Sequence, residues 1–218
     1  MVRFTEPAGM MPHLGRQEGE RLHHHYVGPE HLLLGLLVHG DNPAARVLRA
    51  HGLDLASVRA GVDRLVAQGV LPGPQPSDAE LLATLGIDLQ AVDRRLKETF
   101  GYWAYYDAAQ RVRLRPRQAV PHAPMGGTPL TCVRVLRFAC QEAVARDQPV
   151  GPEHLLLGLL RDAQDPVGTD LDPRERRLRA LLGLPNRGAH PIRLLVEARG
   201  LTLQALAAAV RRELDRDR

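Results

Sequence analysis

Apolar side chains recur at helical spacing along most of the chain, with almost no alternation of the kind that predicts strands. In the first part of the sequence this pattern predicts a helix near residues 14–24, a second beginning at Glu30, a third near 43–50 and a fourth over 55–66. Pro7, Gly9 and Pro12 interrupt the pattern further upstream, so residues 4–12 are expected to be irregular.

An eleven-residue segment occurs twice. Residues 27–37 and 150–160 both read VGPEHLLLGLL, so the chain contains two copies of one unit. In each copy the Gly is an N-cap, the Pro fits the first helical position, and the Glu of the first turn is favoured by the helix dipole. The leucines that follow cover nearly all sides of the helix, which predicts a buried central helix. The Gly inside each run, Gly35 or Gly158, indicates the close approach of a neighbouring helix.

A shorter motif marks three places where one helix ends and the next begins. It covers residues 52–55, 86–89 and 200–203, and in each a Gly terminates one helix while an Asp or Thr two residues later caps the next. Because the motif occurs three times, it favours a repeated structural element.

These elements predict an all-α protein of two pseudo-symmetric four-helix units. The first unit is expected at residues 1–67 and the second, diverged unit at 128–218, with an insertion at about 161–190 that includes a short helix at 176–182. Residues 68–127 are expected to hold a linker, an inserted helical hairpin at 78–100 and a flexible connector rich in Arg and Pro. Val112 and Leu114 leave a short strand open within that connector.

Composition narrows the functional classes. The longest apolar run has seven residues, against about 20 for a membrane helix, and no secretory signal is evident, so a cytoplasmic protein is expected. Cys132 and Cys140 are too far apart on one helix for a disulfide. The only lysine, Lys97, is not in a P-loop, and no catalytic motif is present, so neither an ATPase nor another enzyme is expected.

The repeated helix start, the Ala-Ala-Arg-Val-Leu helix after it and the Gly-Leu-Asp-Leu turn together resemble the Clp repeat. This repeat forms the N-terminal domain of ClpA- and ClpC-type AAA+ unfoldases. Phe4-Thr5-Glu6 matches the opening of that domain. The resemblance covers most of the chain, and two repeats without ATPase modules are similar to free-standing proteins of actinobacteria.

The resemblance implies a non-catalytic module that binds proteins or peptides and needs no cofactor. Such a module would act as an adaptor, regulator or decoy in ATP-dependent Clp proteolysis, with Clp unfoldase or protease components or their substrates as partners. The implied ligand-binding residues are Glu30, Glu153, His31, His154 and Phe4. Phosphoarginine-tagged proteins and cyclic peptides are ligands in the family. Pro29 and Pro152 replace its common Thr, however, and remove a hydroxyl and a backbone donor at each site, which argues against phosphoarginine.

Three other interpretations were weighed. The histidines at 23–25 with His31 suggest a metal, but consecutive helical residues point in different directions, and no ligand set is complete, so no metal is expected. Paired Glu-His residues suggest acid–base chemistry without a nucleophile, and packing or capping suits His31 and His154 better. The alternative function is a DNA-binding regulator that uses the helix-turn-helix-like segment at 201–206 and the arginines of 111–117.

Overall fold

The computed structural model describes residues 3–74, 76, 78–107 and 131–216. Within these ranges the chain is all-α, as the sequence predicts, and one isolated bridge joins Phe4 to Val150. Residues 111–117, with the strand left open there, lie outside the described ranges. The helices are α1 (Glu6–Arg21), α2 (Pro29–Val38), α3 (Pro43–Ala50), α4 (Leu55–Ala67), α5 (Asp78–Thr84), α6 (Leu89–Phe100), α8 (Val133–Val144), α9 (Pro152–Asp162), α10 (Pro173–Leu181), α11 (Pro191–Glu197) and α12 (Leu203–Arg216).

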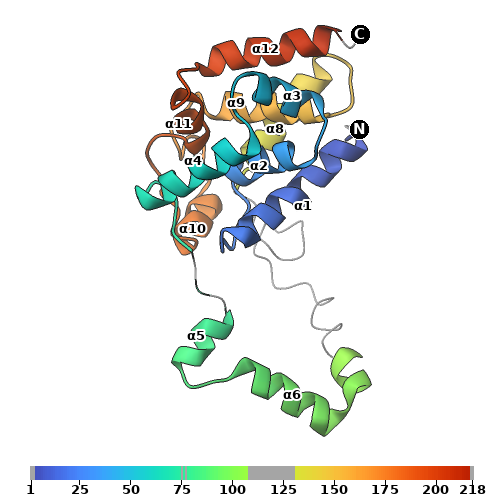
Figure 1. Cartoon of the computed structure of the whole chain (residues 1–218), viewed down its shortest axis with the longest axis vertical. Coiled ribbons are helices and arrows are strands. Elements are labelled where there is room, and N and C mark those ends of the chain that lie inside the picture. The colour runs from blue at the N-terminus through green and yellow to red at the C-terminus, as the bar shows by residue number, and fades with distance from the viewer. Residues whose placement is uncertain (1–2, 75, 77, 108–130, 217–218) are drawn as a thin grey trace.

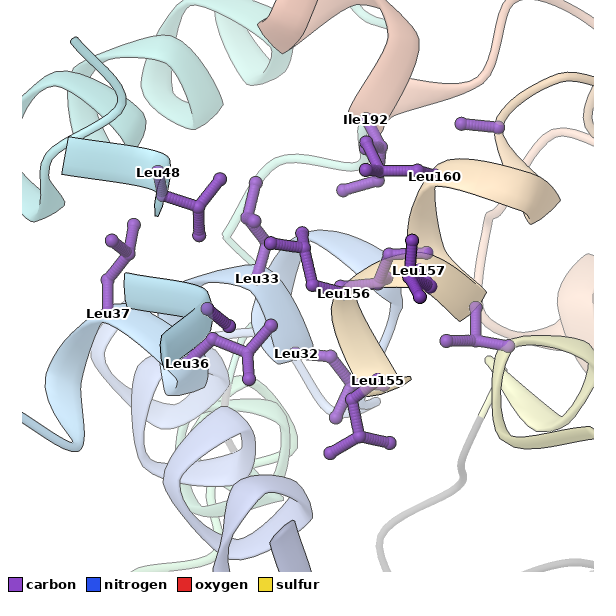
Figure 2. Packing of buried hydrophobic residues seen from close by; sticks show 14 of the residues in the cluster. Leu32, Leu33, Leu36, Leu37, Leu48, Leu155, Leu156, Leu157, Leu160 and Ile192 are labelled. Atoms are coloured by element: carbon purple, nitrogen blue, oxygen red, sulfur yellow. The ribbon is translucent and has the colours of Figure 1, made fainter. Parts of the chain in front are cut away.

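The two copies of the repeated segment form the centre of the molecule. Helices α2 and α9 lie against each other, and the other helices of the main body surround them (Figure 1). Helix α1 packs on α2 in the way that α8 packs on α9. The leucines of the two central helices meet in one continuous core, which Figure 2 shows for Leu32, Leu33, Leu36, Leu155, Leu156 and Leu157.

The glycines of the central helices are contact points, as their sequence context predicts. A Cβ on Gly35 would lie 2.9 Å from the carbonyl oxygen of Met11 in α1. A Cβ on Gly158 would lie 2.5 Å from the carbonyl oxygen of Val135 in α8. Both distances are too short for a real Cβ, so each central helix touches its neighbour through backbone.

The expectation that residues 4–12 are irregular is wrong. Helix α1 begins at Glu6, where the Thr5 hydroxyl accepts a hydrogen bond from the backbone N–H of Ala8 at 3.3 Å. Pro7 lies in the first turn, where its missing N–H has no partner to lose. Pro12 does lie inside the helix. Tertiary packing outweighs its cost, since Gly15 in the same helix sits directly against the backbone of α2.

The three predicted turns have the expected geometry. Gly52, Gly86 and Gly200 have φ values of +74°, +76° and +70°, a region that favours glycine. Asp54 caps α4 by accepting from the backbone N–H of Ser57 at 2.7 Å. Asp88 and Thr202 cap α6 and α12 in the same manner.

The first residues of each unit form backbone hydrogen bonds with the other unit. The Thr5 N–H donates to the Val150 carbonyl at 3.0 Å, and the Val150 N–H donates to the Arg3 carbonyl at 2.8 Å. In the other direction, the Thr131 N–H donates to the Val27 carbonyl at 2.9 Å. Each unit therefore begins by pairing with the residue that precedes the central helix of the other unit.

The inserted segments take two different places. The insertion of the second unit contains α10 and folds onto the main body, whereas α5 and α6 lie apart from it (Figure 1). Cys132 and Cys140 are unpaired, as expected; the first is buried and the second half-buried. None of the described helices combines the length and apolar character that crossing a membrane requires.

Candidate functional site

Each central helix starts with a cap made by its own histidine. The backbone N–H of Gly28 donates to Nδ1 of His31 at 2.9 Å, and that of Gly151 donates to Nδ1 of His154 at 3.1 Å. Both rings are fully buried. The histidines thus do what a Glu or Gln does in a capping box, and their effect on a ligand is confined to the backbone that they position.

The two predicted glutamates fold back over these caps. A side chain on Gly28 would collide with the Glu30 carboxylate, and one on Gly151 would collide with that of Glu153. Oε1 of Glu30 lies 3.4 Å from Nδ1 of His31, and Oε1 of Glu153 lies 3.1 Å from Nδ1 of His154. A side chain at either glycine would therefore make the glutamate carboxylate shift from this position.

Burial distinguishes the two glutamates. Glu30 is only 1% exposed, and its Oε1 has no hydrogen-bond partner among the described residues. The Glu153 side chain is 13% exposed. A buried carboxylate oxygen without a hydrogen bond costs free energy, so a hydrogen-bond donor is expected next to Oε1 of Glu30.

The insertion of the second unit covers Glu30. Leu178, Leu182 and Leu184 pack on Tyr26, just before α2, and bury it. Beside Tyr26 and Glu30 lies a cavity of about 60 Å³, which Arg179 of α10 also lines. The corresponding connection in the first unit, between α2 and α3, is only residues 39–42 and provides no comparable cover.

Charges of both signs line this cavity. Arg134 of α8 is ion-paired with Asp162 at 3.4 Å and with Asp165, and Asp162 also lies 3.1 Å from Nε2 of His190. Burial lowers the pKa of the Arg179 guanidinium, while the nearby Glu30 carboxylate raises it. Burial raises the pKa of Tyr26, and Glu30 raises it further. The sequence offers no local signal for Tyr26, Arg134 or Arg179, because each reaches the cavity through the tertiary fold.

Phe4 lies at the second helix start. The backbone of Phe4 forms a bridge with Val150, which comes three residues before Glu153 in the sequence. The Phe4 side chain is 45% exposed. A surface hollow of about 640 Å³ runs along Phe4, Val144 and Gln148. The structure therefore brings the backbone of Phe4 to the segment before the second helix start, and it places Glu30 under the insertion.

The histidine run contributes one buried ring. Nδ1 of His24 lies 3.0 Å from Nε2 of His31, and the His24 ring stacks on Tyr26 with centroids 5.3 Å apart. Because Nδ1 of His31 accepts from a backbone N–H, Nε2 of the neutral ring carries the proton and donates it to His24. Burial and the neighbouring His31 lower the pKa of His24 to about 4.

The same ring and its neighbours offer a possible metal-ligand set. His24, His31 and Glu30 bring ligand atoms within 4.8 Å of one another. The hydrogen bonds, however, occupy both nitrogens of His31, so a metal would have to displace the helix cap. His25, another member of the histidine run, is instead exposed, and its Nε2 lies 3.3 Å from the carbonyl oxygen of Pro76.

The C-terminal segment is part of the core. Leu203, Leu206 and Val210 of α12 are buried against the main body. On its exposed side, Arg211 lies 3.8 Å from Glu142 and Arg216 lies 3.7 Å from Glu213. The arginines here are thus partly neutralised by carboxylates.

Comparison with known proteins agrees with the helical unit that contains the first copy of the repeated helix start. Residues 3–78 match the model of the family described as the Clp repeat (R) N-terminal domain. These residues form a Clp repeat. A similar structure is the N-terminal domain of the caseinolytic protease associated chaperone ClpD from Arabidopsis thaliana, with a TM-score of 0.51 and 16% identity over 98% of this chain and 95% of that one. The chain therefore has the Clp N-terminal domain fold along nearly its whole length.

Curated relatives match the Clp repeat region. A probable ATP-dependent Clp protease ATP-binding subunit of Chlamydia pneumoniae is 43% identical over 67 residues, which are 31% of this chain and 8% of that protein. The chloroplastic chaperone protein ClpC of Pisum sativum is 40% identical over 67 residues, which are 31% of this chain and 7% of that protein. The match thus spans less than a tenth of the length of these relatives.

Proposed function

We propose that this chain is a non-catalytic protein- or peptide-binding module of the Clp system, which works in the cytoplasm as an adaptor, regulator or decoy. The observation that carries the proposal is the Clp repeat at residues 3–78 within a Clp N-terminal domain fold that extends along nearly the whole chain. The named relatives of that repeat are subunits and chaperones of ATP-dependent Clp proteases. The partners are accordingly a Clp unfoldase, its peptidase or their substrates.

The proposed binding site is the second helix start. Glu153 offers a partly exposed carboxylate, and Phe4, whose backbone pairs with Val150 just before this helix start, offers an exposed aromatic ring. A carboxylate can hold a guanidinium through two hydrogen bonds, and an aromatic face attracts cations and apolar side chains. The fitting ligand is a peptide with an Arg or Lys next to an apolar residue.

The first helix start is proposed to be closed in this chain. Glu30 has the same place in its helix, but α10 and the leucines after it cover the approach. Phosphoarginine is not favoured at either start, because Pro29 and Pro152 remove a donor from each. His31 and His154 serve the site only by fixing the helix start.

A capture experiment tests this proposal. The purified chain is incubated with a ClpC-type unfoldase and its peptidase, and capture is compared for the chain itself, Glu153→Ala, and the control Glu197→Ala, which changes an exposed residue at the end of α11. We expect Glu153→Ala to lose capture and Glu197→Ala to keep it. Equal capture by both variants would show that the binding site lies elsewhere. No capture by the chain or by either variant would contradict a Clp partner.

A degradation assay separates the possible roles. An adaptor accelerates degradation of a fluorescent Clp substrate, whereas a decoy slows it in proportion to the amount of chain added. No effect at concentrations that saturate capture would exclude both roles. The DNA-binding alternative predicts a gel shift at low salt, and the ion-paired arginines of α12 give it no specific support.

A further inference from the structure

The α5–α6 segment forms a unit of its own. Residues 78–107, called the arm here, contain α5, α6 and a helical turn at 102–107. Among the described helices, α5 and α6 make substantial contact only with each other, and they lie apart from the main body (Figure 1). The fold of the two Clp-like units therefore leaves the arm without a core of its own.

One face of the arm is apolar and open. Leu89, Val92, Leu96 and Phe100 follow each other at helical spacing on α6 and are 40–64% exposed. Leu85 in the turn before α6 is 74% exposed, and the other exposed large apolar side chains of the arm are Leu81, Ile87, Tyr102, Trp103 and Tyr106. Such a continuous face is unusual on a surface that stays in water.

The arm is too small to fold stably by itself. Helices shorter than about 12–15 residues are marginal in water, and units below about 40 residues need a disulfide, a metal or a partner. The arm has 30 residues and no cysteine. The described residues of the arm also contain no group of side chains arranged to hold a metal. A partner surface would supply the stability that the described residues of the arm do not provide by themselves.

We propose that the arm is a self-association surface, with the arm of a second copy of this chain as its occupant. The exposed aromatic rings at 100, 102 and 103 alone offer roughly 400 Å² of surface, at about 200 Å² for a fully buried ring. Six exposed aliphatic side chains add to that area and bring the face toward the 800 Å² or so that each partner buries in a standard interface.

The face also carries shapes that complement each other. A hollow of about 390 Å³ is bordered by Leu89, Val92 and Leu96, and a second of about 450 Å³ by Ile87 and Leu89. Trp103, in the helical turn that follows α6, is 79% exposed. In a twofold dimer a protruding residue of each copy enters a hollow of the other, which is the requirement for an isologous interface.

The charges of the arm make it possible to distinguish self-association from binding of a basic partner by their dependence on salt. The sequence of residues 78–107 has six acidic and three basic side chains, so two arms repel each other weakly at long range. Salt screens that repulsion without weakening apolar contact. Dimerisation through the arm should therefore strengthen as ionic strength rises, whereas binding of a basic partner or segment would weaken.

Trp103 is the only tryptophan of the chain and reports directly on the arm. The full chain is measured by sedimentation and by Trp103 emission from low to high micromolar concentration, at low and high salt. Phe100→Asp and Leu85→Asp, both at exposed positions, are compared with the control Leu181→Asp on α10, which is 85% exposed. Helix content by circular dichroism shows whether the arm stays folded in each variant.

We expect a dimer whose emission shifts to shorter wavelength as it forms, and a dissociation constant at least tenfold weaker for the two arm variants but unchanged for Leu181→Asp. A chain that is monomeric at every concentration would overturn the proposal. So would a dimer that the arm variants leave intact, or one that salt weakens, since these results would assign the interface to the main body or to a basic occupant.

Discussion

At the scale of single residues, His31 and His154 show how a repeated motif serves two purposes. Each imidazole satisfies a backbone N–H that the helix start would otherwise leave unpaired, and each turns the preceding glutamate back over a glycine. In the proposed site, His154 holds the turn from which Glu153 would reach a ligand. The structural histidines and the proposed binding glutamates therefore have to be tested separately.

Replacing His154 with Ala should lower the free energy of unfolding by about 2–4 kcal/mol, because a cap and a buried ring are lost together. His154→Gln should recover part of this loss, since Gln can accept the same hydrogen bond. Urea unfolding measures the difference, with the exposed His13→Ala as the control. Equal stability of His154→Ala and the unmodified chain would show that the cap is dispensable.

The buried His24 makes the protein less stable in mild acid. Its pKa of about 4 in the folded chain lies below the 6.5 of the unfolded chain, so the unfolded state binds the proton first as the pH falls. From pH 7.5 to pH 5 this difference should remove about 2 kcal/mol of stability. His24→Gln should flatten the pH profile over that range. An equally steep profile in the variant would assign the acid sensitivity to other groups.

At the scale of elements, the contact between α1 and α2 explains why a helix full of glycine and proline forms at all. Propensity alone predicts a break, and the sequence was interpreted in that way. Gly15 of α1 and Gly35 of α2 are instead the places where the two backbones touch, so burial of the helix against its neighbour compensates for its poor intrinsic tendency to form.

Two glycines of this pair should therefore respond in opposite ways to Ala. Gly35→Ala should destabilise the protein by about 1–3 kcal/mol, because the new methyl meets the Met11 backbone at 2.9 Å. Gly9→Ala should stabilise it by up to about 1 kcal/mol, because nothing lies within 4 Å and Ala favours the helix. Urea midpoints check both changes, and a stable Gly35→Ala variant would mean that the helices can separate without cost.

At the scale of the whole molecule, local signals predicted the elements and missed their partners. Helix α3 is predicted near residues 43–50 and observed at Pro43–Ala50, where Asn42 caps it and Pro43 takes its first position. The pairing of Thr5 with Val150 spans 145 residues and leaves no trace in the local pattern. The sequence likewise located the insertion but could not indicate that it covers Glu30 and leaves Glu153 open.

The exchanged pairing predicts that neither unit folds alone. A fragment of residues 1–74 lacks the partners of both Phe4 and Val27, so it should show little helix and no cooperative thermal transition. Circular dichroism of this fragment, beside the full chain, provides the test. A cooperative transition in the fragment would show that the first Clp repeat is an autonomous domain.

The same pairing has a mechanical consequence. The hydrogen bonds of residues 3–5 with Val150 lie at the very beginning of the described chain, yet they support the helix start of the other unit. A motor that draws in the N-terminal end would load these bonds first, and their rupture would loosen the Glu153 helix start while most of the first unit was still folded. Resistance to pulling is thus shared between the units, and the proposed Glu153 site would be lost before the chain as a whole unfolds.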